Sequence, residues 1–144
     1  MRVEVTDSPF DPWAEVAAYE RSRRQAGKYG ATAVFVGTMR DCNDGDTVRS
    51  MSLEHYPGMT ERSLRDTATE VAGRHGLLDV LIVHRAGTLH PGEPIVLVAT
   101  WSAHRAAAFA GCREIMEYLK ARAPFWKKET LAQGQRWVEK NTPG

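Results

Sequence analysis

Hydrophobic and polar residues change their spacing repeatedly along this chain, and each spacing predicts an element. Residues 1–5 alternate as in a short strand. The segment after it places Asp11 as an N-cap, Pro12 at the first helical position and Gly27 as a stop, which predicts a helix. Residues 30–39 are small or β-branched, as is typical of a buried strand.

The middle of the chain continues with a strand and a second helix. The cluster "RDCNDGD" favours a turn, and residues 47–56 then alternate, so we expect an antiparallel strand that forms a hairpin with the strand before the turn. Residues 57–76 carry Leu64, Ala68 and Val71 on one helical face and end in a glycine. They predict an amphipathic helix.

The last part of the chain predicts a second hairpin and the longest helix. Residues 77–87 and 94–102 are both strand-like, with the turn sequence "TLHPGE" between them. Residues 103–123 then predict a helix that Pro124 ends. Its predicted buried face consists of Phe109, Cys112, Met116 and Leu119. The remainder fits two short strands around a turn at Gly134.

The predicted order is therefore β α β β α β β α β β. Hairpins between helices indicate an α+β fold with a mainly antiparallel sheet and three main helices. Neither an internal repeat nor a linker-like tract interrupts the pattern, so residues 1–144 are expected to form a single domain.

Composition limits the classes of protein that remain. Hydrophobic residues make up 42% and charged residues 26%, as in ordinary globular proteins, and no apolar run is long enough to span a bilayer. The net charge of +1 gives no electrostatic reason to expect a nucleic-acid or membrane partner. The first residues do not resemble a secretory signal, so we expect a cytoplasmic protein. Cys42 and Cys112 are expected to be reduced, with Cys112 the more buried, and no metal site is expected.

Lysines are unevenly distributed, and this points to a first candidate site. Only five of the nineteen basic residues are lysines, and Lys120, Lys127 and Lys128 lie within nine positions of one another. Two lysines in one pocket lower each other's pKa, and apolar walls such as Phe125 and Trp126 lower both further. Such a lysine can act as acid, base or nucleophile near neutral pH. The alternative is that these lysines are solvated.

Two further groups are candidates for binding an anion. Ser102 can cap a helix whose first turn contains His104 and Arg105, and a helix N-terminus beside an arginine suits phosphate or carboxylate. Arg40 leaves a buried strand and enters a turn, where it could also bind an anion. The alternatives are a solvated first turn for Arg105 and an ion pair with a neighbouring aspartate, Asp41 or Asp44, for Arg40.

Other chemistries are less well supported. The chain lacks the motifs of serine hydrolases, of phosphate-binding loops and of HExxH metalloproteases. His55, His84 and His90 have no metal-ligand spacing, so we expect structural roles for them. Cys42, in a turn near Arg40, could be a reactive thiol, but no obvious base accompanies it.

Several motifs, in order, resemble the large catalytic subunit of molybdopterin synthase. They are "LEHYPGMTE" at 53–61, "VHRAGTLHPGE" at 83–93, "SAHRAAAF" at 102–109, "YLKARAPFWKKE" at 118–129 and "WVE" at 137–139. The resemblance is strongest over residues 30–139, and the first 29 residues add little to it.

The resemblance implies an α/β hammerhead fold and a sulfur-transfer reaction in molybdenum cofactor biosynthesis. In that family, cyclic pyranopterin monophosphate becomes molybdopterin when two sulfurs are installed as a dithiolene. The sulfur comes from the C-terminal thiocarboxylate of a small ubiquitin-like subunit that ends in Gly-Gly. The large subunit forms a homodimer within a heterotetramer, and the synthase needs neither a metal nor an organic cofactor.

Matching motif to motif, the resemblance assigns two catalytic residues, Lys120 and Lys127. The substrate-binding residues that it implies are Thr38, Met39, Arg40, His104, Arg105, Lys120, Lys127, Lys128 and Glu129. As a hypothesis, Lys120 transfers protons at the carbons that gain sulfur, and Lys127 binds phosphate or the carboxylate that remains on the partner's tail.

Two positions depart from the family pattern, and two other functions remain as alternatives. Cys42 stands where the family commonly has a histidine, and Lys140 would have to supply the basic residue that reaches across from a neighbouring protomer. One alternative function is a non-catalytic relative that only binds the small subunit. The other is a single-stranded nucleic-acid binder that uses Phe125 and Trp126 for stacking, and it predicts a steep salt dependence.

Overall fold

The computed structural model describes residues 1–23, 26–43, 45–131 and 134–138. In chain order the elements are β1 (Arg2–Thr6), α1 (Pro12–Arg23), β2 (Ala31–Thr38), β3 (Cys42–Asn43), β4 (Asp46–His55), α2 (Met59–His75), β5 (Asp79–Arg85), β6 (Gly87–Leu89), β7 (Pro94–Ser102), α3 (Arg105–Ala121), β8 (Phe125–Leu131) and β9 (Gly134–Trp137). The predicted order is confirmed, and β3 and β6 are two short strands that the sequence pattern did not indicate.

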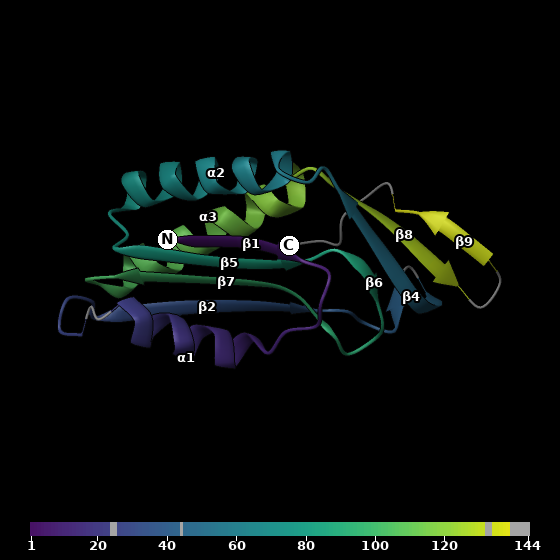
Figure 1. Cartoon of the computed structure of the whole chain (residues 1–144), viewed down its shortest axis with the longest axis horizontal. Helices are drawn as coiled ribbons and strands as arrows, with labels where there is room; N and C mark the ends of the chain where they lie inside the picture. The colour runs from purple at the N-terminus through teal and green to yellow at the C-terminus, as the bar shows by residue number, and fades with distance from the viewer. Residues whose placement is uncertain (24–25, 44, 132–133, 139–144) are drawn as a thin grey trace.

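A four-stranded sheet forms the centre of the molecule, with strand order β1-β5-β7-β2 (Figure 1). Strand β1 runs parallel to β5, and the other neighbours are antiparallel. Every residue of β5 is buried, and so are the last seven of β7. Both strands are nearly continuous apolar runs because both faces of the sheet are covered.

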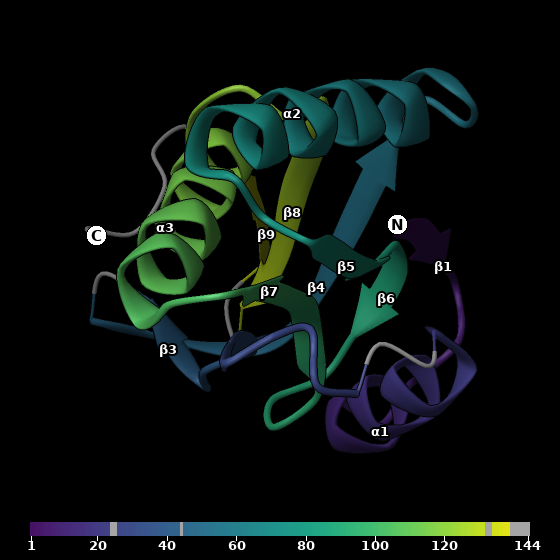
Figure 2. The same ribbon diagram turned by 90° about the vertical axis from the view of Figure 1, so that its left-hand side faces the viewer.

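Helices cover the two faces of this sheet, α2 and α3 on one side and α1 on the other (Figure 2). The predicted face of α2 is confirmed, since Leu64, Ala68 and Val71 are all buried against the sheet. Helix α1 begins as predicted, because the carboxylate of Asp11 accepts hydrogen bonds from the backbone N–H groups of the first turn. It ends at Arg23, before the predicted stop at Gly27.

The predicted face of α3 is correct for Cys112 and Met116 but wrong for Phe109, which is 68% exposed. The buried stripe is centred instead on Ala108 and Ile115. The reason is the close approach of α3 at Gly111, where a Cβ atom would lie 2.7 Å from the side chain of Leu77. Phe109 lies two positions before Gly111, about 200° around the helix, and so points away from this contact.

The predicted hairpin between β2 and β4 is wrong. All of β2 pairs with β7, whereas β4 pairs with β3, β6 and β8 in a second sheet. The chain does not turn back after β2 because Met39 is held by the segment before β7. Its N–H donates to the carbonyl of Glu93 at 3.0 Å, and its own carbonyl accepts from Gly92 at 2.8 Å.

The second sheet has the order β3-β4-β8-β9 and lies at one end of the first (Figure 1). The predicted hairpin of β5 and β7 is confirmed, but the segment that joins them contains β6, which pairs with β4. Strand β6 thereby connects the two sheets. A small core of Met39, Val48, Met51, Leu53 and Leu89 fills the space beneath this connection.

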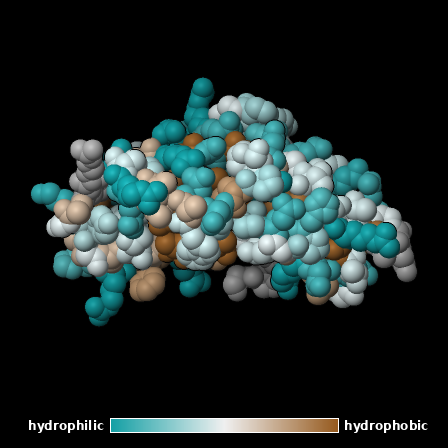
Figure 3. Space-filling view, turned by 60° about the horizontal axis from the view of Figure 1, so that its bottom comes forward, coloured by the Kyte–Doolittle hydropathy of each residue, from teal (hydrophilic) through white to brown (hydrophobic). Residues whose placement is uncertain are grey.

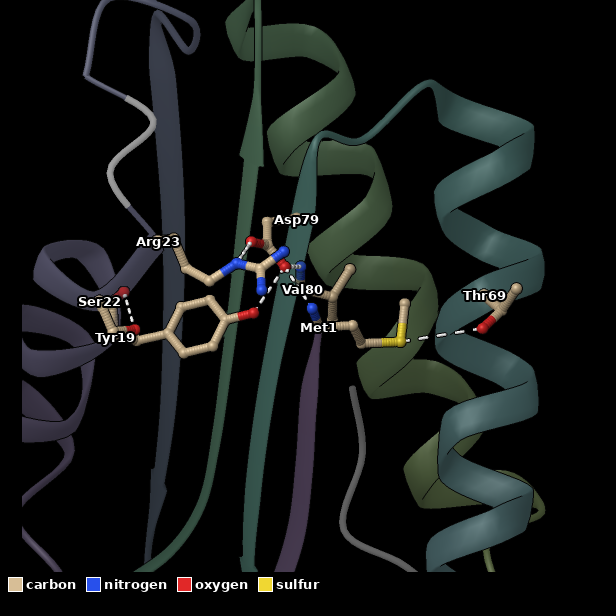
Figure 4. Close-up of polar contacts among 7 residues, drawn as sticks. All are labelled: Met1, Tyr19, Ser22, Arg23, Thr69, Asp79 and Val80. Atoms are coloured by element: carbon tan, nitrogen blue, oxygen red, sulfur yellow. Dashed lines mark hydrogen bonds and ion pairs between the residues drawn. The ribbon is translucent and has the colours of Figure 1, made fainter.

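A buried carboxylate fastens α1 and the first strand to the central sheet. Asp79 accepts hydrogen bonds from the Tyr19 hydroxyl at 2.7 Å and from Arg23 at 2.8 Å, and its carboxylate pairs with the α-ammonium group of Met1 at 2.9 Å (Figure 4). Burial alone would raise the pKa of Asp79, but these donors outweigh it and the pKa is lowered. This cluster stays charged and structural at neutral pH.

Most of the side chains on the face shown in Figure 3 are hydrophilic, and the hydrophobic ones between them form only small areas. Among the described helices, none combines the length and the hydrophobicity that a membrane span requires.

Candidate functional site

The structure brings Lys120 and Lys127 together. Lys120 lies in the last turn of α3 and Lys127 in β8, with the break at Pro124 between them. The two amino groups are close enough for a hydrogen bond, and both side chains line two adjoining cavities. The two lysines therefore lie in one pocket, as the sequence predicted.

The environment of Lys127 changes its acidity. Burial, the charge of Lys120 and the contact with Lys120 together lower the pKa of Lys127 from 10.5 to about 8, against a small opposing effect of Glu129. Both the apolar surroundings and the second ammonium disfavour a charge on Lys127. Its amino group can consequently gain or lose a proton near neutral pH, as catalysis by proton transfer requires.

The first cavity combines the strand end after β2 with the face of β8 that bears Lys127, and we call it the polar cavity because it holds most of the charged side chains, although apolar residues also line it. Its charged and polar walls are Thr38, Arg40, Cys42, Asn43, Lys120, Lys127 and Glu129. Thr38 and Arg40 are exposed, whereas Met39 is buried beneath them. Among the described residues Arg40 makes no ion pair, so the predicted alternative of a pair with Asp41 does not occur, and Asp44 lies outside the described residues.

Glu129 forms the floor of this first cavity. It is buried, and its carboxylate accepts hydrogen bonds from the side chain of Asn43 at 2.6 Å and from Arg136 at 3.4 Å. Arg136 also pairs with Asp46 at 2.8 Å. Glu129 is thus held between β3 and β9, and it offsets the positive charge of the lysines beside it.

The second cavity has a volume of about 250 Å³, and we call it the apolar cavity because most of the residues that line it are of apolar types. Its apolar walls include Phe35, Leu53, Met116, Leu119 and Phe125, and the two lysines lie where it adjoins the first cavity. The site therefore has an apolar approach on one side of the lysine pair and a cationic, polar pocket on the other.

His84 also lines the second cavity. It lies on the central strand β5, and its ring stacks on Phe125 with centroids 3.9 Å apart and an interplanar angle of 17°. Its Nδ1 lies 2.7 Å from the carbonyl oxygen of Arg85. Burial and the charges of Lys127 and Lys120 lower the pKa of His84 to about 4, so the imidazole is neutral at physiological pH.

His104 and Arg105 do not join this site within one chain. Both are exposed at the N-terminal end of α3, and fifteen residues of helix separate Arg105 from Lys120, a distance of about 22 Å. The predicted cap by Ser102 is wrong, because Ser102 belongs to β7 and the N-cap is His104, without a side-chain capping bond. The Ser102 hydroxyl instead donates to the carbonyl of His104.

Lys128 and Glu129, the remaining candidates on β8, point to opposite faces of the strand because side chains alternate along it. Glu129 lies on the same face as Lys127, but Lys128 points to the other face, where its amino group lies 5.5 Å from the centre of the Trp137 ring. Lys128 therefore does not line either cavity. Lys140 lies outside the described residues.

The two cysteines are as the sequence predicted. Both cysteines are free, with Cys42 exposed and Cys112 buried. Within the described part of the chain, no three His, Cys, Asp or Glu side chains gather as metal ligands. Sequence reasoning missed the contribution of His84, Asn43 and Arg136 to the site, because strand pairings that are distant in the sequence bring them there.

Comparisons with known proteins place this geometry in a family. The family model described as "MoaE protein" matches residues 5–122. A "Molybdopterin synthase catalytic subunit" of Ralstonia nicotianae is 52% identical over 137 residues, which are 95% of this chain and 76% of that protein. The match to residue 5 shows that the resemblance also includes the first 29 residues, which sequence reasoning had discounted.

Solved structures agree with this assignment. The "Molybdopterin biosynthesis MoaE protein" of Burkholderia ambifaria is 48% identical, with a TM-score of 0.81, and the match covers 100% of this chain and 93% of that one. A "Protein-protein complex of subunit 1 and 2 of Molybdopterin-converting factor" from Helicobacter pylori shares the fold at 19% identity, with a TM-score of 0.78 and coverage of 96% and 91%. The predicted α+β fold is confirmed, and the chain belongs to the MoaE protein family, whose similar members are named as catalytic subunits of molybdopterin synthase.

Proposed function

We propose that this chain is the catalytic subunit of a molybdopterin synthase. In this proposal it converts cyclic pyranopterin monophosphate to molybdopterin with sulfur from the C-terminal thiocarboxylate of a small ubiquitin-like subunit. The observation that carries the proposal is the pair of Lys120 and Lys127 at the junction of an apolar and a polar cavity, in a member of the MoaE family. A reaction between a protein tail and a phosphorylated small molecule needs such a two-sided site.

The polar cavity suits the pterin precursor. Its cyclic phosphate is an anion, and Arg40 offers a planar guanidinium that can bind two phosphate oxygens at once. Arg40 is exposed at this cavity and makes no ion pair with another described residue, so a ligand can reach it. The amino groups of Lys120 and Lys127 lie further in, where the carbons that receive sulfur would have to lie.

The apolar cavity suits the tail of the small subunit. A Gly-Gly terminus has no side chains, so it can enter a narrow apolar channel and bring its thiocarboxylate to the lysines. The complex of two subunits from Helicobacter pylori, which has the same fold, is consistent with a small partner. A free small molecule would not need the apolar approach that Phe35, Leu119 and Phe125 form.

The two lysines have different roles in this proposal. The low pKa of Lys127 suits it to exchanging a proton with the carbons that gain sulfur, the role that the sequence assigned to Lys120. Lys120, whose charge helps to lower that pKa, is then the cationic partner that binds the thiocarboxylate and, after transfer, the carboxylate. Glu129 on the floor of the polar cavity keeps the net charge of the site low.

His104 and Arg105 enter this proposal through a second copy of the chain. They lie about 22 Å along α3 from Lys120, so they cannot reach the same substrate within one chain. A homodimer in which each α3 presents its first turn to the other chain's polar cavity would unite the predicted anion binders, and two small subunits would complete a heterotetramer.

Location in the cytoplasm also stays a prediction of the sequence.

Reconstitution tests the proposed function. The purified chain is mixed with cyclic pyranopterin monophosphate and a small subunit that carries a C-terminal thiocarboxylate, and the dithiolene product is quantified. The same small subunit with an ordinary carboxylate is the control. Product with the thiocarboxylate alone supports the proposal, whereas a stable complex of the two subunits without product favours the alternative of a non-catalytic binding protein.

A further inference from the structure

The contact of His84 with Phe125 joins the two sheets directly beside the lysine pair. His84 belongs to the central strand of the first sheet, where it pairs with Val5 on one side and Val96 on the other. Phe125 is the first residue of β8 in the second sheet and lies two positions before Lys127. Because side chains alternate along a strand, Phe125 and Lys127 point to the same face of β8.

A hydrogen bond orients the ring of His84, and neighbouring rings contact Phe125. The carbonyl oxygen of Arg85 can only accept a hydrogen bond, so the Nδ1 of His84 that lies 2.7 Å from it carries the proton. This bond sets the plane of the imidazole ring, and Phe125 stacks on that plane. The ring of His55 lies 6.1 Å from Phe125, centre to centre. Phe125 therefore has ring contacts with two histidines that come from different sheets.

His84 also closes the apolar cavity around Lys127. It is 7% exposed and lines this cavity together with Phe125, Lys120 and Lys127. Burial is the largest cause of the low pKa of Lys127, so a residue that keeps water out of this space contributes to that pKa. The charged or titratable groups that act on His84 are Lys127, Lys120 and His55.

We propose that His84 is a positioning residue for Lys127, acting through Phe125 and through the cavity wall. In its neutral form it packs against the lysine pair without adding a third charge. Its hydrogen bond to Arg85 fixes the ring, the ring fixes Phe125, and Phe125 sets the start of β8 and with it the position of the Lys127 amino group. This inference rests on the proposed function for its catalytic meaning, but its structural part can be measured without turnover.

The direct test is the acidity of Lys127 in the whole protein without ligands. Trace acetylation with acetic anhydride is measured against pH, and fragment ions in the mass spectrum separate Lys127 from Lys128. The wild type should show a midpoint near 8. In His84→Ala, water enters the space left by the ring, and the midpoint should rise toward the ordinary value of 10.5. A rise of one unit lowers the reactive fraction at pH 8 from about a half to about a tenth.

Two variants and an internal standard make this test specific. His84→Phe keeps a flat ring for stacking, so its Lys127 midpoint should stay near the wild-type value. His75→Gln removes a histidine at the end of α2, where it pairs with Glu114, and should change nothing at Lys127. Lys28 is exposed and serves as the internal standard for reagent strength. If His84→Ala does not fold, His84→Val replaces it, because a β-branched residue suits a central strand.

The outcomes separate this inference from the proposed function. An unchanged Lys127 midpoint in a folded His84→Ala or His84→Val protein would overturn the inference, because the low pKa would then not depend on His84. A midpoint in His84→Phe that rises as far as in His84→Ala would also overturn it. In the reconstituted reaction, His84→Ala should lower turnover by a larger factor than it raises the dissociation constant of the small subunit. If the wild type forms no product, the proposed function fails and the labelling result still stands.

Discussion

The two ends of α3 carry the strongest candidates for chemistry, and their surroundings differ: one end lines cavities and the other faces solvent. At the C-terminal end, Lys120 meets Lys127 between two cavities, and the pKa of Lys127 falls to about 8. At the N-terminal end, His104 and Arg105 are exposed to solvent. The same helix thus holds one end in an environment that changes acidity and leaves the other available for binding. Under the proposed function, this difference predicts proton transfer at the lysine end and anion binding at the other end.

The largest expected effect is on turnover at the lysine end. Lys127→Ala and Lys120→Ala should each lower the rate of dithiolene formation by about 10²-fold to 10⁴-fold, the usual contribution of proton transfer by a positioned group. Both variants should lose far less affinity for the small subunit than turnover. Lys28→Ala, at an exposed lysine outside the cavities, is the matched control and should keep the wild-type rate. Equal losses of turnover and of partner binding would show that the lysines only position the tail.

A second expected effect is a pH dependence of stability that originates beside the lysines. The pKa of His84 is about 4 in the folded protein and 6.5 in the unfolded chain, so the unfolded chain binds the proton first as pH falls. The free energy of unfolding should therefore decrease between pH 6.5 and about 4, by at most about 3 kcal/mol. Urea denaturation at several pH values measures this decrease.

The matched comparison for this pH effect is between His84→Phe and His104→Gln. His84→Phe removes the buried titrating group and should flatten the curve over this pH range. His104→Gln removes an exposed histidine that makes no side-chain capping bond and should leave the curve as it is. A wild-type curve that is flat between pH 4 and 6.5 would mean that His84 titrates normally.

A third effect concerns the support of the N-terminal end. A Cβ atom at Gly30 would lie 2.5 Å from the carbonyl oxygen of Ala103, directly before His104. Gly30→Ala should displace the connection between β7 and α3 and cost about 1–3 kcal/mol of stability. Gly73→Ala is the matched control, since no neighbouring atom lies within 4 Å of its added Cβ, and it should stabilise α2 by up to about 1 kcal/mol. Thermal and urea denaturation of both variants would check the two signs.

The smallest effect on stability should come from Arg105→Ala. The side chain is exposed and forms no ion pair with another described residue, so the free energy of unfolding should change by less than about 0.5 kcal/mol. The same variant should raise the KM for the pterin precursor, because we place Arg105 among the residues that bind its phosphate. A change in stability without a change in KM would assign this arginine to the fold instead.

Local signals in the sequence predicted most of the elements. The helical period identified α2 through Leu64, Ala68 and Val71, and the capping residue Asp11 located the start of α1. These predictions succeed because capping and periodicity depend on residues within a few positions of one another. The uneven distribution of lysines and the strand-end position of Arg40 made these residues candidates, and the family resemblance gave them roles. The structure brings Lys120, Lys127 and Arg40 to one pair of cavities.

Predictions that needed distant pairing failed. The sequence gives no signal that β4 pairs with β8, seventy residues later, and so a hairpin of β4 with β2 was the simpler expectation. The role of His84 could not be predicted either, because its contact with Phe125 depends on where β8 lies in the fold. The face of α3 that is buried includes Gly111, which packs closely on Leu77, and this leaves Phe109 exposed. Periodicity alone does not contain that information.

The central claim is that the lysine end of one α3 works with the His104 and Arg105 end of another. It can be tested by co-expressing Lys127→Ala and Arg105→Ala chains with different tags and purifying the mixed dimer. A mixed dimer of this kind contains one site in which both ends are intact, so at a low concentration of the pterin precursor we predict about half of the wild-type turnover. At that concentration each variant alone should turn over far more slowly, Lys127→Ala through its lost amino group and Arg105→Ala through its raised KM. A mixed dimer of Lys120→Ala and Lys127→Ala, which has no intact site, should stay inactive. Failure of the first mixture to recover turnover would contradict the account and show that each chain acts alone.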